Sequence, residues 1–317
     1  MHNDNLISVE HLSRRYAGLV AVRDVSFELQ RGEVLGFLGP NGAGKTTTMQ
    51  IITGNLAPTS GRILINGLDL LDRPRQAKGE IGYLPEQPPL YRELTVDEYL
   101  RFCARLNRLR RDTIGRAVDR AKQRCGLEQV GRRLINNLSR GYQQRVGIAQ
   151  AIIHSPAIVV LDEPTVGLDP IQIREIRELI RELGKEHGVI LSTHILPEVQ
   201  MTCDRVQIIN RGQLVFSDHV DNLNRRMQST SLILGLHQPP AQHILSTLPD
   251  INDVQALDNH RFRLLYAAEA NPAEAIARQA VEQGWGLFEL TPEHKTLEQI
   301  FVEITSSEQS DGEIAAA

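Results

Sequence analysis

The sequence predicts an α/β fold with a largely parallel sheet, followed by a smaller α+β unit. Short apolar runs alternate with segments of helical periodicity over most of the chain, as expected when crossover helices connect parallel strands. One of these runs, residues 34–38, ends in a glycine-rich loop, and another, residues 158–161, ends in two carboxylates. With 317 residues, the chain has room for one large domain and one small one.

The N-terminal residues predict an antiparallel β subdomain. Residues 6–16 and 21–29 are rich in apolar side chains, and the alternation in the second run is typical of a half-buried strand. A turn at Gly18 joins the two. Further short strands are expected at residues 62–65 and 81–84.

The segment from about 95 to 140 is predicted to be a helical insertion in this core. Thr95 and Glu98 form a capping box, which marks a helix start. The insertion is rich in arginine, but it lacks aromatic interleaving, and acids such as Asp112 and Asp119 are interspersed. Since the net charge is also −4, we expect a solvated helix face and no nucleic-acid partner. The arginines are Arg101, Arg105, Arg108, Arg110, Arg111, Arg116, Arg120 and Arg124.

The chain returns to the sheet after the insertion. Asp169 and Pro170 are a favourable N-cap and first residue for a helix. Residues 189–193 predict a strand, and residues 205–216 predict a hairpin that turns at an Asn-Arg-Gly sequence.

A change of pattern divides the chain into a first domain, 1–227, and a second, 228–306. The second shows the order strand, helix, two strands, helix, strand, which is the βαββαβ order of a ferredoxin-like unit. Its first helix is expected at 239–248, and an amphipathic helix is expected at 297–304. The tail, 307–317, has too little apolar content to pack and is expected to be disordered.

Residues 39–46 match the phosphate-binding pattern G-x-x-x-x-G-K-[ST]. The glycines let successive N–H groups point at phosphate oxygens, and the helix that starts at Thr46 adds the positive end of its dipole. Lys45 supplies a charge for the β and γ phosphates, and Thr46 supplies a hydroxyl for Mg²⁺. The loop therefore predicts a nucleoside triphosphate and Mg²⁺ as ligands. The residues expected to contact the nucleotide are Gly39, Pro40, Asn41, Gly42, Ala43, Gly44, Lys45, Thr46 and Thr47.

The apolar run at 158–161 ends in Asp162 and Glu163. A buried strand that ends in an acid pair indicates that the acids have a chemical role. Asp162 is placed to hold Mg²⁺ through water. Glu163 is placed to orient and deprotonate the attacking water.

Residues 138–145, LSRGYQQR, precede a helical segment and predict a second phosphate-binding helix start. Ser139 is suited to cap the helix, and Gly141 leaves room for a ligand near the backbone. Together with the loop at 39–46, IVVLDEPTVGLDP and STH, this stretch resembles the nucleotide-binding subunit of ABC transporters. The resemblance covers roughly residues 6–220, in the family's order and spacing.

The resemblance implies the P-loop NTPase fold of ABC ATPases and further roles for matching residues. Tyr16 is similar to the aromatic residue that stacks on adenine, although an ordinary tyrosine at a strand end is the alternative. Asp169 resembles the aspartate that links two sites across a dimer. His194 resembles the histidine that contacts the γ-phosphate. Ser139 and Gly141 are then expected to serve the ATP held by another chain.

Two departures from the family pattern affect these expectations. The signature is usually LSGGQ, and here Arg140 and Tyr142 replace its third and fifth residues. The family also places a glutamine after Tyr-x-Pro to sense Mg²⁺ and the membrane partner. Glu86 stands in that register and Gln87 is one step later. A carboxylate can also bind Mg²⁺, so either residue is a candidate.

The resemblance implies an ATP-hydrolysing subunit that powers a membrane transporter through a head-to-tail dimer with two ATP molecules between the chains. The C-terminal unit resembles the appended domain of export ATPases of the ABC-2 type, including drug-resistance and gliding-motility subfamilies. The alternative is a soluble ABC-type ATPase in DNA repair or translation. A P-loop kinase or GTPase leaves LSRGYQQR unexplained.

The sequence also predicts partners and location. No apolar run reaches the ~20 residues needed to span a bilayer, and the first residues do not form a secretion signal. We therefore expect a cytoplasmic protein at the inner face of the plasma membrane, bound there only through an integral membrane permease, with a second ATPase chain. The three separate cysteines are expected to be small buried apolar residues.

Overall fold

The computed structural model describes residues 5–227, 230–267 and 270–293. The chain divides into two compact units, Met1–Val220 and Asp221–Ala317, each with its own hydrophobic core. The sequence places the boundary at 227/228, at the end of helix α8 (Val220–Met227), whereas the compact units separate at the start of that helix.

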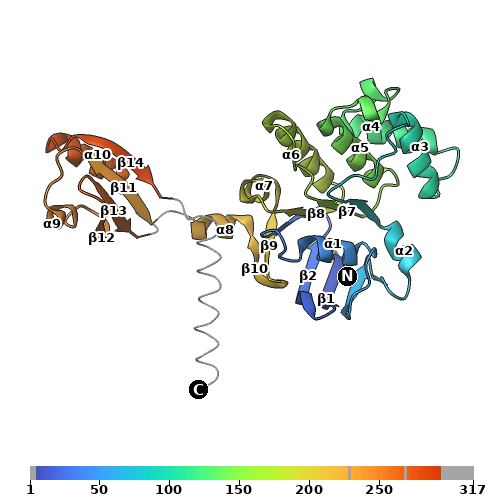
Figure 1. Cartoon of the computed structure of the whole chain (residues 1–317), viewed down its shortest axis with the longest axis horizontal. Coiled ribbons are helices and arrows are strands. Elements are labelled where there is room, and N and C mark those ends of the chain that lie inside the picture. Colours follow the sequence, from blue (N-terminus) through green and yellow to red (C-terminus); the bar gives the residue numbers. More distant parts are fainter. Residues whose placement is uncertain (1–4, 228–229, 268–269, 294–317) are drawn as a thin grey trace, which may run out of the picture. The chain divides into compact units, whose positions relative to one another are not determined.

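A six-stranded sheet forms the centre of the first unit (Figure 1). Its strands are β3 (Val34–Leu38), β6 (Ile81–Leu84), β7 (Ile158–Asp162), β8 (Gly188–Thr193), β9 (Arg205–Asn210) and β10 (Gln213–His219). They lie in the order β10-β9-β3-β8-β7-β6, and all neighbours are parallel except β10 and β9. Since β3, β8 and β7 are adjacent and parallel, the loops that follow them meet at one edge of the sheet.

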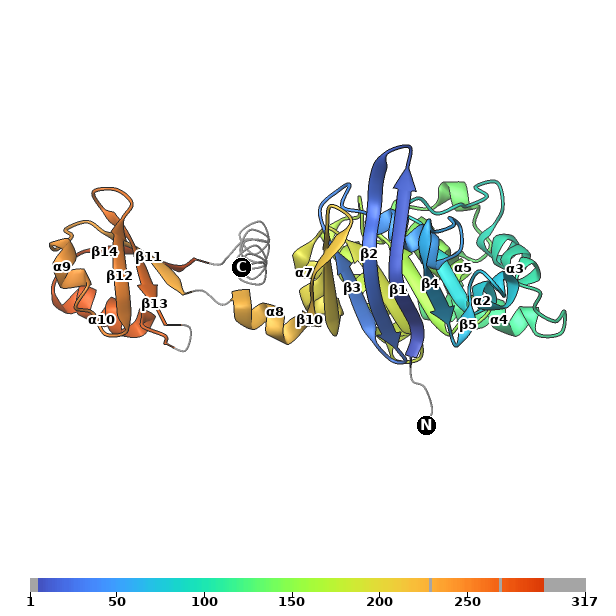
Figure 2. The same cartoon turned by 90° about the horizontal axis from the view of Figure 1, so that it is seen from below.

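A second, antiparallel sheet packs against the first and is seen face-on in Figure 2. It consists of β1 (Asn5–Tyr16), β2 (Leu19–Gln30), β4 (Ser60–Ile65) and β5 (Leu68–Asp69), in the order β2-β1-β4-β5. The main core lies between the two sheets. Phe27 of β2 and Phe37 of β3 meet there with ring centroids 5.7 Å apart.

The helical insertion consists of α3 (Val96–Leu106), α4 (Ile114–Cys125) and two 3₁₀ turns, η1 (Glu128–Val130) and η2 (Ile135–Asn137), and it leads into α5 (Arg140–Ile152). The capping box is confirmed: the Glu98 backbone donates to Thr95 Oγ1, and the Thr95 backbone donates to Glu98. The solvated face is also confirmed, since most of the arginines are exposed. Arg110 pairs with Asp112 there.

The remaining helices of the first unit connect the strands. They are α1 (Lys45–Ile52), α2 (Pro74–Gly79), α6 (Pro170–Gly184) and α7 (Leu196–Thr202). Within the described residues, no helix is both long enough and apolar enough to cross a bilayer. All three cysteines are free and buried, as expected.

The second unit has the predicted βαββαβ order. Its elements are β11 (Ser231–Leu236), α9 (Gln242–Leu245), β12 (Ile251–Ala256), β13 (Arg261–Tyr266), α10 (Ala273–Glu282) and β14 (Leu287–Pro292). The sheet order is β12-β13-β11-β14, and every neighbouring pair is antiparallel. One face packs on the helices through a core that includes Leu234, Phe262 and Trp285. The fold class of both units is confirmed.

Several boundaries differ from the sequence-based expectation. The first helix of the second unit was expected at 239–248 and covers only Gln242–Leu245. It starts late because Pro240 disfavours the helical conformation at the residue before it, and Ala241 is extended, with ψ 141°. The first helix after the glycine-rich loop begins at Lys45, one residue before Thr46. The helix expected at 297–304 and the tail at 307–317 lie outside the described residues.

Candidate nucleotide-binding site

The glycine-rich loop between β3 and α1 is shaped by close backbone contacts. A Cβ on Gly39 would lie 2.4 Å from the carbonyl oxygen of Ile209, and one on Gly44 would lie 2.6 Å from that of Ala21. Gly44 also has φ 109°, a left-handed value that favours glycine. As the N-cap of α1 it makes no side-chain hydrogen bond, so the first N–H groups of the helix stay available to a ligand.

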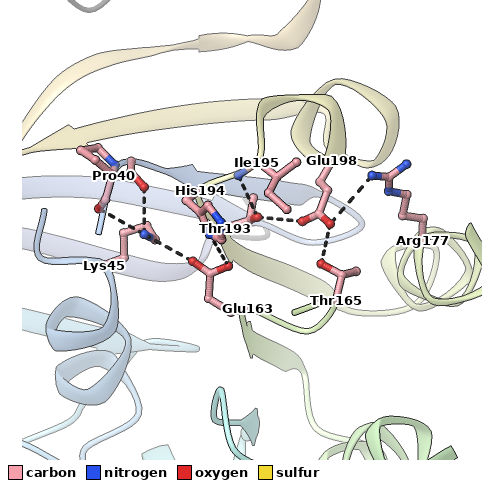
Figure 3. Close-up of polar contacts among 10 residues, drawn as sticks. Pro40, Lys45, Glu163, Thr165, Arg177, Thr193, His194, Ile195 and Glu198 are labelled. Carbon is pink, nitrogen blue, oxygen red and sulfur yellow. Dashed lines mark hydrogen bonds and ion pairs between the residues drawn. The ribbon is translucent and has the colours of Figure 1, made fainter. Parts of the chain in front are cut away.

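Lys45 is buried, and its ammonium group is held by the loop itself (Figure 3). The Nζ atom donates to the carbonyl oxygen of Gly39 at 2.8 Å and to that of Pro40 at 3.3 Å. It also lies 3.3 Å from Oε1 of Glu163. A buried cation and a buried carboxylate therefore balance each other at the mouth of the loop.

Glu163 and His194 meet at the ends of β7 and β8. Oε2 of Glu163 lies 2.9 Å from Nδ1 of His194 (Figure 3). The backbone N–H of Glu163 donates to the carbonyl oxygen of Ser192 at 2.9 Å, which fixes the two strand ends together. Glu163 has φ 49°, so the backbone turns sharply directly after the strand and directs this side chain away from the sheet.

Asp162 differs from Glu163 because its side chain is fully buried. Within the described part of the chain, neither carboxylate oxygen has a hydrogen-bond partner, and the same holds for Oγ of Ser192. Burial raises the pKa of Asp162, while the nearby hydroxyls of Ser192 and Thr46 act in the opposite direction. Oxygen atoms without a hydrogen-bond partner, next to a phosphate-binding loop, fit Mg²⁺, because this ion prefers oxygen ligands and retains bound water.

These elements enclose a cavity of 760 Å³. It brings together most of the predicted site residues, and its lining includes Tyr16, Asn41, Gly42, Gly44, Lys45, Thr46, Thr47, Glu86, Glu163 and His194. Tyr16 is 39% exposed, and the guanidinium carbon of Arg14 lies 4.6 Å from the centroid of its ring. Arg14 therefore covers only one face of an exposed ring, and a second flat group has room on the other.

The lining of this cavity distinguishes Glu86 from Gln87. Both side chains are exposed, but of the two only Glu86 is among the described residues that line it. Glu86 is also close enough to Asp162 to raise the pKa of that carboxyl. The geometry therefore favours Glu86 over Gln87 as a residue of this site.

A separate cavity of 740 Å³ is lined by three further predicted site residues, Ser139, Gly141 and Asp169. Ser139 caps α5 by accepting from the backbone N–H of Tyr142 at 3.4 Å, and Asp169 caps α6 by accepting from that of Gln172 at 2.9 Å. A Cβ on Gly141 would lie 2.5 Å from the Gln172 side chain. None of the described residues that line the first cavity also lines the second.

Sequence reasoning missed some residues near the first cavity. Val20 and Ala21 line it from the start of β2, and Arg211 lines it from the β9–β10 turn. The Asn-Arg-Gly turn was recognised as a hairpin signal, but its approach to the loop depends on the tertiary fold. Arg140, one of the two departures in the signature, lies against Gly167, where an added Cβ would be 2.3 Å from its guanidinium.

A glycine-rich loop with a buried lysine, a carboxylate next to a histidine and an acid suited to Mg²⁺ define a nucleoside triphosphate hydrolase. Residues 22–166 match the ABC transporter family. The bacitracin transport ATP-binding protein BcrA of Bacillus licheniformis is 32% identical over 301 residues, which cover 94% of this chain and 97% of that protein. The chain therefore belongs to the ABC transporter family as an ATP-binding subunit that hydrolyses ATP.

Solved structures agree with this assignment. CbiO1 from Clostridium perfringens, described as part of the transporter complex CbiONQ, is 33% identical with a TM-score of 0.65, over 70% of this chain and 91% of that one. The cassette MJ0796, solved as a dimer with ADP and phosphate, shares the fold at 23% identity and a TM-score of 0.62, over 68% and 98% of the two chains.

Proposed function

We propose that the chain powers an ABC-2-type exporter by forming a head-to-tail dimer that holds two ATP molecules between its chains. The observation that carries this proposal is the separation of the two cavities. The first contains Lys45, Glu163 and His194, and the second contains Ser139 and Gly141. A second chain can place its Ser139 helix opposite the first chain's loop, and each ATP site is then completed in trans.

Binding of ATP uses the loop and the residues around it. The N–H groups at the start of α1 and the ammonium of Lys45 hold the β and γ phosphates. Tyr16 stacks on the base with the face that Arg14 leaves open. Thr46 and Asp162 would hold Mg²⁺, with Glu86 as a further ligand. The metal would neutralise charge that develops on the phosphates during cleavage.

Hydrolysis depends on Glu163. Its carboxylate accepts a proton from the attacking water, while His194 orients it through the Nδ1 contact and presents the rest of its ring to the γ-phosphate. When phosphate arrives, Lys45 exchanges its contact with Glu163 for one with the ligand. The carboxylate is then released to act on water only in the occupied site.

Coupling to transport requires a permease. The match to BcrA extends over nearly the whole chain and therefore includes the second unit, and that protein is named for bacitracin transport. CbiO1 is part of a multi-subunit transporter complex. Both relatives favour a subunit that works at the cytoplasmic face of a membrane, bound there through an integral membrane partner.

The test is Glu163→Gln, which keeps the shape of the side chain and removes the base. We expect MgATP binding to persist and turnover to fall about 10²- to 10⁴-fold, as is typical when a general base is lost. The variant should accumulate as an ATP-bound dimer in size-exclusion chromatography. Glu178→Gln is the matched control, because that carboxylate pairs with Arg174 on the exposed side of α6. A Glu163→Gln protein that stays monomeric with wild-type turnover contradicts the proposal.

The permease is tested separately. The tagged chain should co-purify with an integral membrane protein from detergent-solubilised membranes of its own host. Recovery with DNA or ribosomes instead would favour the soluble alternative.

A further inference from the structure

Glu198 is a buried acid with no role in the site described above. It lies in the first turn of α7, shortly after His194, and is only 1% exposed. A carboxylate buried to this degree needs donors or an opposite charge to be stable. Glu198 does not line the first cavity, so the groups that stabilise its buried charge must come from the protein itself.

The partners of Glu198 come from three different elements (Figure 3). Oγ1 of Thr165, in the loop after β7, donates to Oε1, and Oγ1 of Thr193, the last residue of β8, donates to Oε2 at 2.7 Å. A guanidinium nitrogen of Arg177, from α6, lies 3.8 Å from Oε1. One carboxylate thus joins the loop, the strand end and the helix.

Both threonines lie beside the residues that carry out the reaction. Thr193 precedes His194, and its Oγ1 also accepts from the N–H of Ile195 at 3.1 Å, which fixes the chain on both sides of the histidine. Thr165 closely follows Glu163, and the next residue, Val166, donates its N–H to the Glu163 carbonyl oxygen at 3.3 Å. Through their shared partner Glu198, the hydroxyls of Thr165 and Thr193 therefore fix the distance between the segment that contains Glu163 and the segment that contains His194.

Arg177 extends the connection towards the second cavity. It belongs to α6, which Asp169 caps at the edge of that cavity. The segment from Thr165 to Asp169 is a tight turn, closed by the N–H of Leu168 donating to the Thr165 carbonyl oxygen at 3.2 Å. A displacement of Asp169 can therefore be transmitted to Glu198 by two routes, through Arg177 of α6 and through Thr165 of the turn.

We propose that Glu198 is a positioning residue for ATP hydrolysis, which holds Glu163 and His194 at contact distance and links them to the Asp169 turn. It acts through Thr165 and Thr193 and does not touch nucleotide. The proposal rests on the proposed function, since it assumes that Glu163 and His194 act on the γ-phosphate.

The test compares substitutions that keep either shape or hydroxyl. Thr165→Val and Thr193→Val keep the shape and remove the donor, whereas Thr165→Ser and Thr193→Ser keep the donor and remove a methyl group. We expect kcat to fall about tenfold to a hundredfold in the valine variants, because small displacements of reacting groups have effects of this size. The serine variants should stay within about threefold of wild type, and the KM for MgATP should be unchanged throughout.

Glu198→Gln is expected to lower kcat in the same range, with Glu178→Gln again as the surface control. Thermal unfolding of every variant shows whether a lower kcat comes only from a smaller fraction of folded protein. Adding Glu198→Gln to Glu163→Gln should lower turnover by less than the product of the two single losses, because part of the effect of Glu198 passes through Glu163. The proposal is overturned if the valine variants keep wild-type kcat, if the serine variants lose as much as the valine variants, or if the two losses multiply.

These results are separable from the proposed function. Wild-type turnover in Glu163→Gln contradicts the assignment of the base. Loss of turnover in Glu163→Gln together with wild-type rates in all the Thr165, Thr193 and Glu198 variants contradicts only the positioning role.

Discussion

Two helices of the first unit begin where phosphate is expected, and they begin in different ways. α1 has Gly44 as its N-cap, in a left-handed conformation and with no side-chain hydrogen bond. α5 has Ser139, whose hydroxyl accepts from the backbone N–H of Tyr142. Both helix starts carry positive partial charge, but only the first is accompanied by a buried lysine, Lys45.

The difference shows what each helix start can do alone. The start of α1 leaves its N–H groups to a ligand and holds an ammonium beside them, so it is prepared to bind phosphate within one chain. At the start of α5, the serine already accepts from the N–H of Tyr142. The cavity there contains Arg145, which pairs with Glu175, but no lysine among the described lining residues. This asymmetry supports a half-site that contributes to ATP held elsewhere.

The largest expected effect on stability is in the glycine-rich loop that leads into α1. In Gly39→Ala the new Cβ would meet the Ile209 carbonyl oxygen, which is backbone and cannot turn away. We expect the free energy of unfolding without nucleotide to fall by about 1–3 kcal/mol, with at least tenfold weaker MgATP binding. Gly115→Ala is the control, because a Cβ there meets nothing within 4 Å. Equal denaturant midpoints for the two variants would show that the loop is not tightly constrained.

A smaller effect on stability is expected at the capped helix start. Ser139→Ala removes the cap of α5 and should lower the free energy of unfolding by about 0.5–2 kcal/mol. Thr95→Ala removes the cap of α3 and should have a similar effect on stability. Only Ser139→Ala should reduce ATP turnover, because of the two residues only Ser139 lines the second cavity, where we propose that the ATP of another chain is contacted. Steady-state ATPase assays on both proteins test this, and equal turnover would argue against the half-site.

The smallest effect on stability is expected for Gly141→Ala. Its Cβ would meet the Gln172 side chain, which can turn away, and alanine gains up to about 1 kcal/mol over glycine in a helix. The free energy of unfolding should therefore change by less than about 1 kcal/mol. Turnover should still fall, because the Gln172 side chain, which lines the second cavity beside Gly141, has to move into the space that we propose for the phosphate of another chain. Adding Gln172→Ala makes room for the methyl group, and turnover that then returns to wild type would place the obstruction inside the chain.

The first unit could be predicted from the sequence where local rules are strong. The residues before Asp162 are uniformly apolar, as a strand buried on both faces requires, so the acids after them stood out. The caps at Thr95, Ser139 and Asp169 were also predictable, because a capping side chain bonds to the backbone only a few residues away.

Other features could not be predicted because they depend on distant parts of the chain. No sequence pattern singles out Glu198, because its partners come from two other segments and a second helix. The choice between Glu86 and Gln87 depended on the path of the chain after β6. That path decides which of the two neighbouring side chains lines the first cavity.

The sequence by itself determined the chemistry of the molecule: a loop for phosphate, an acid pair after a buried strand and a second helix start with its own cap. Each is local, since it depends on residues close together in the chain. Only the tertiary structure decided that Glu163 and His194 touch, that Ser139 and Lys45 face different cavities, and that Glu198 joins three elements. These contacts follow from the order and parallel pairing of β3, β8 and β7, which no local pattern specifies.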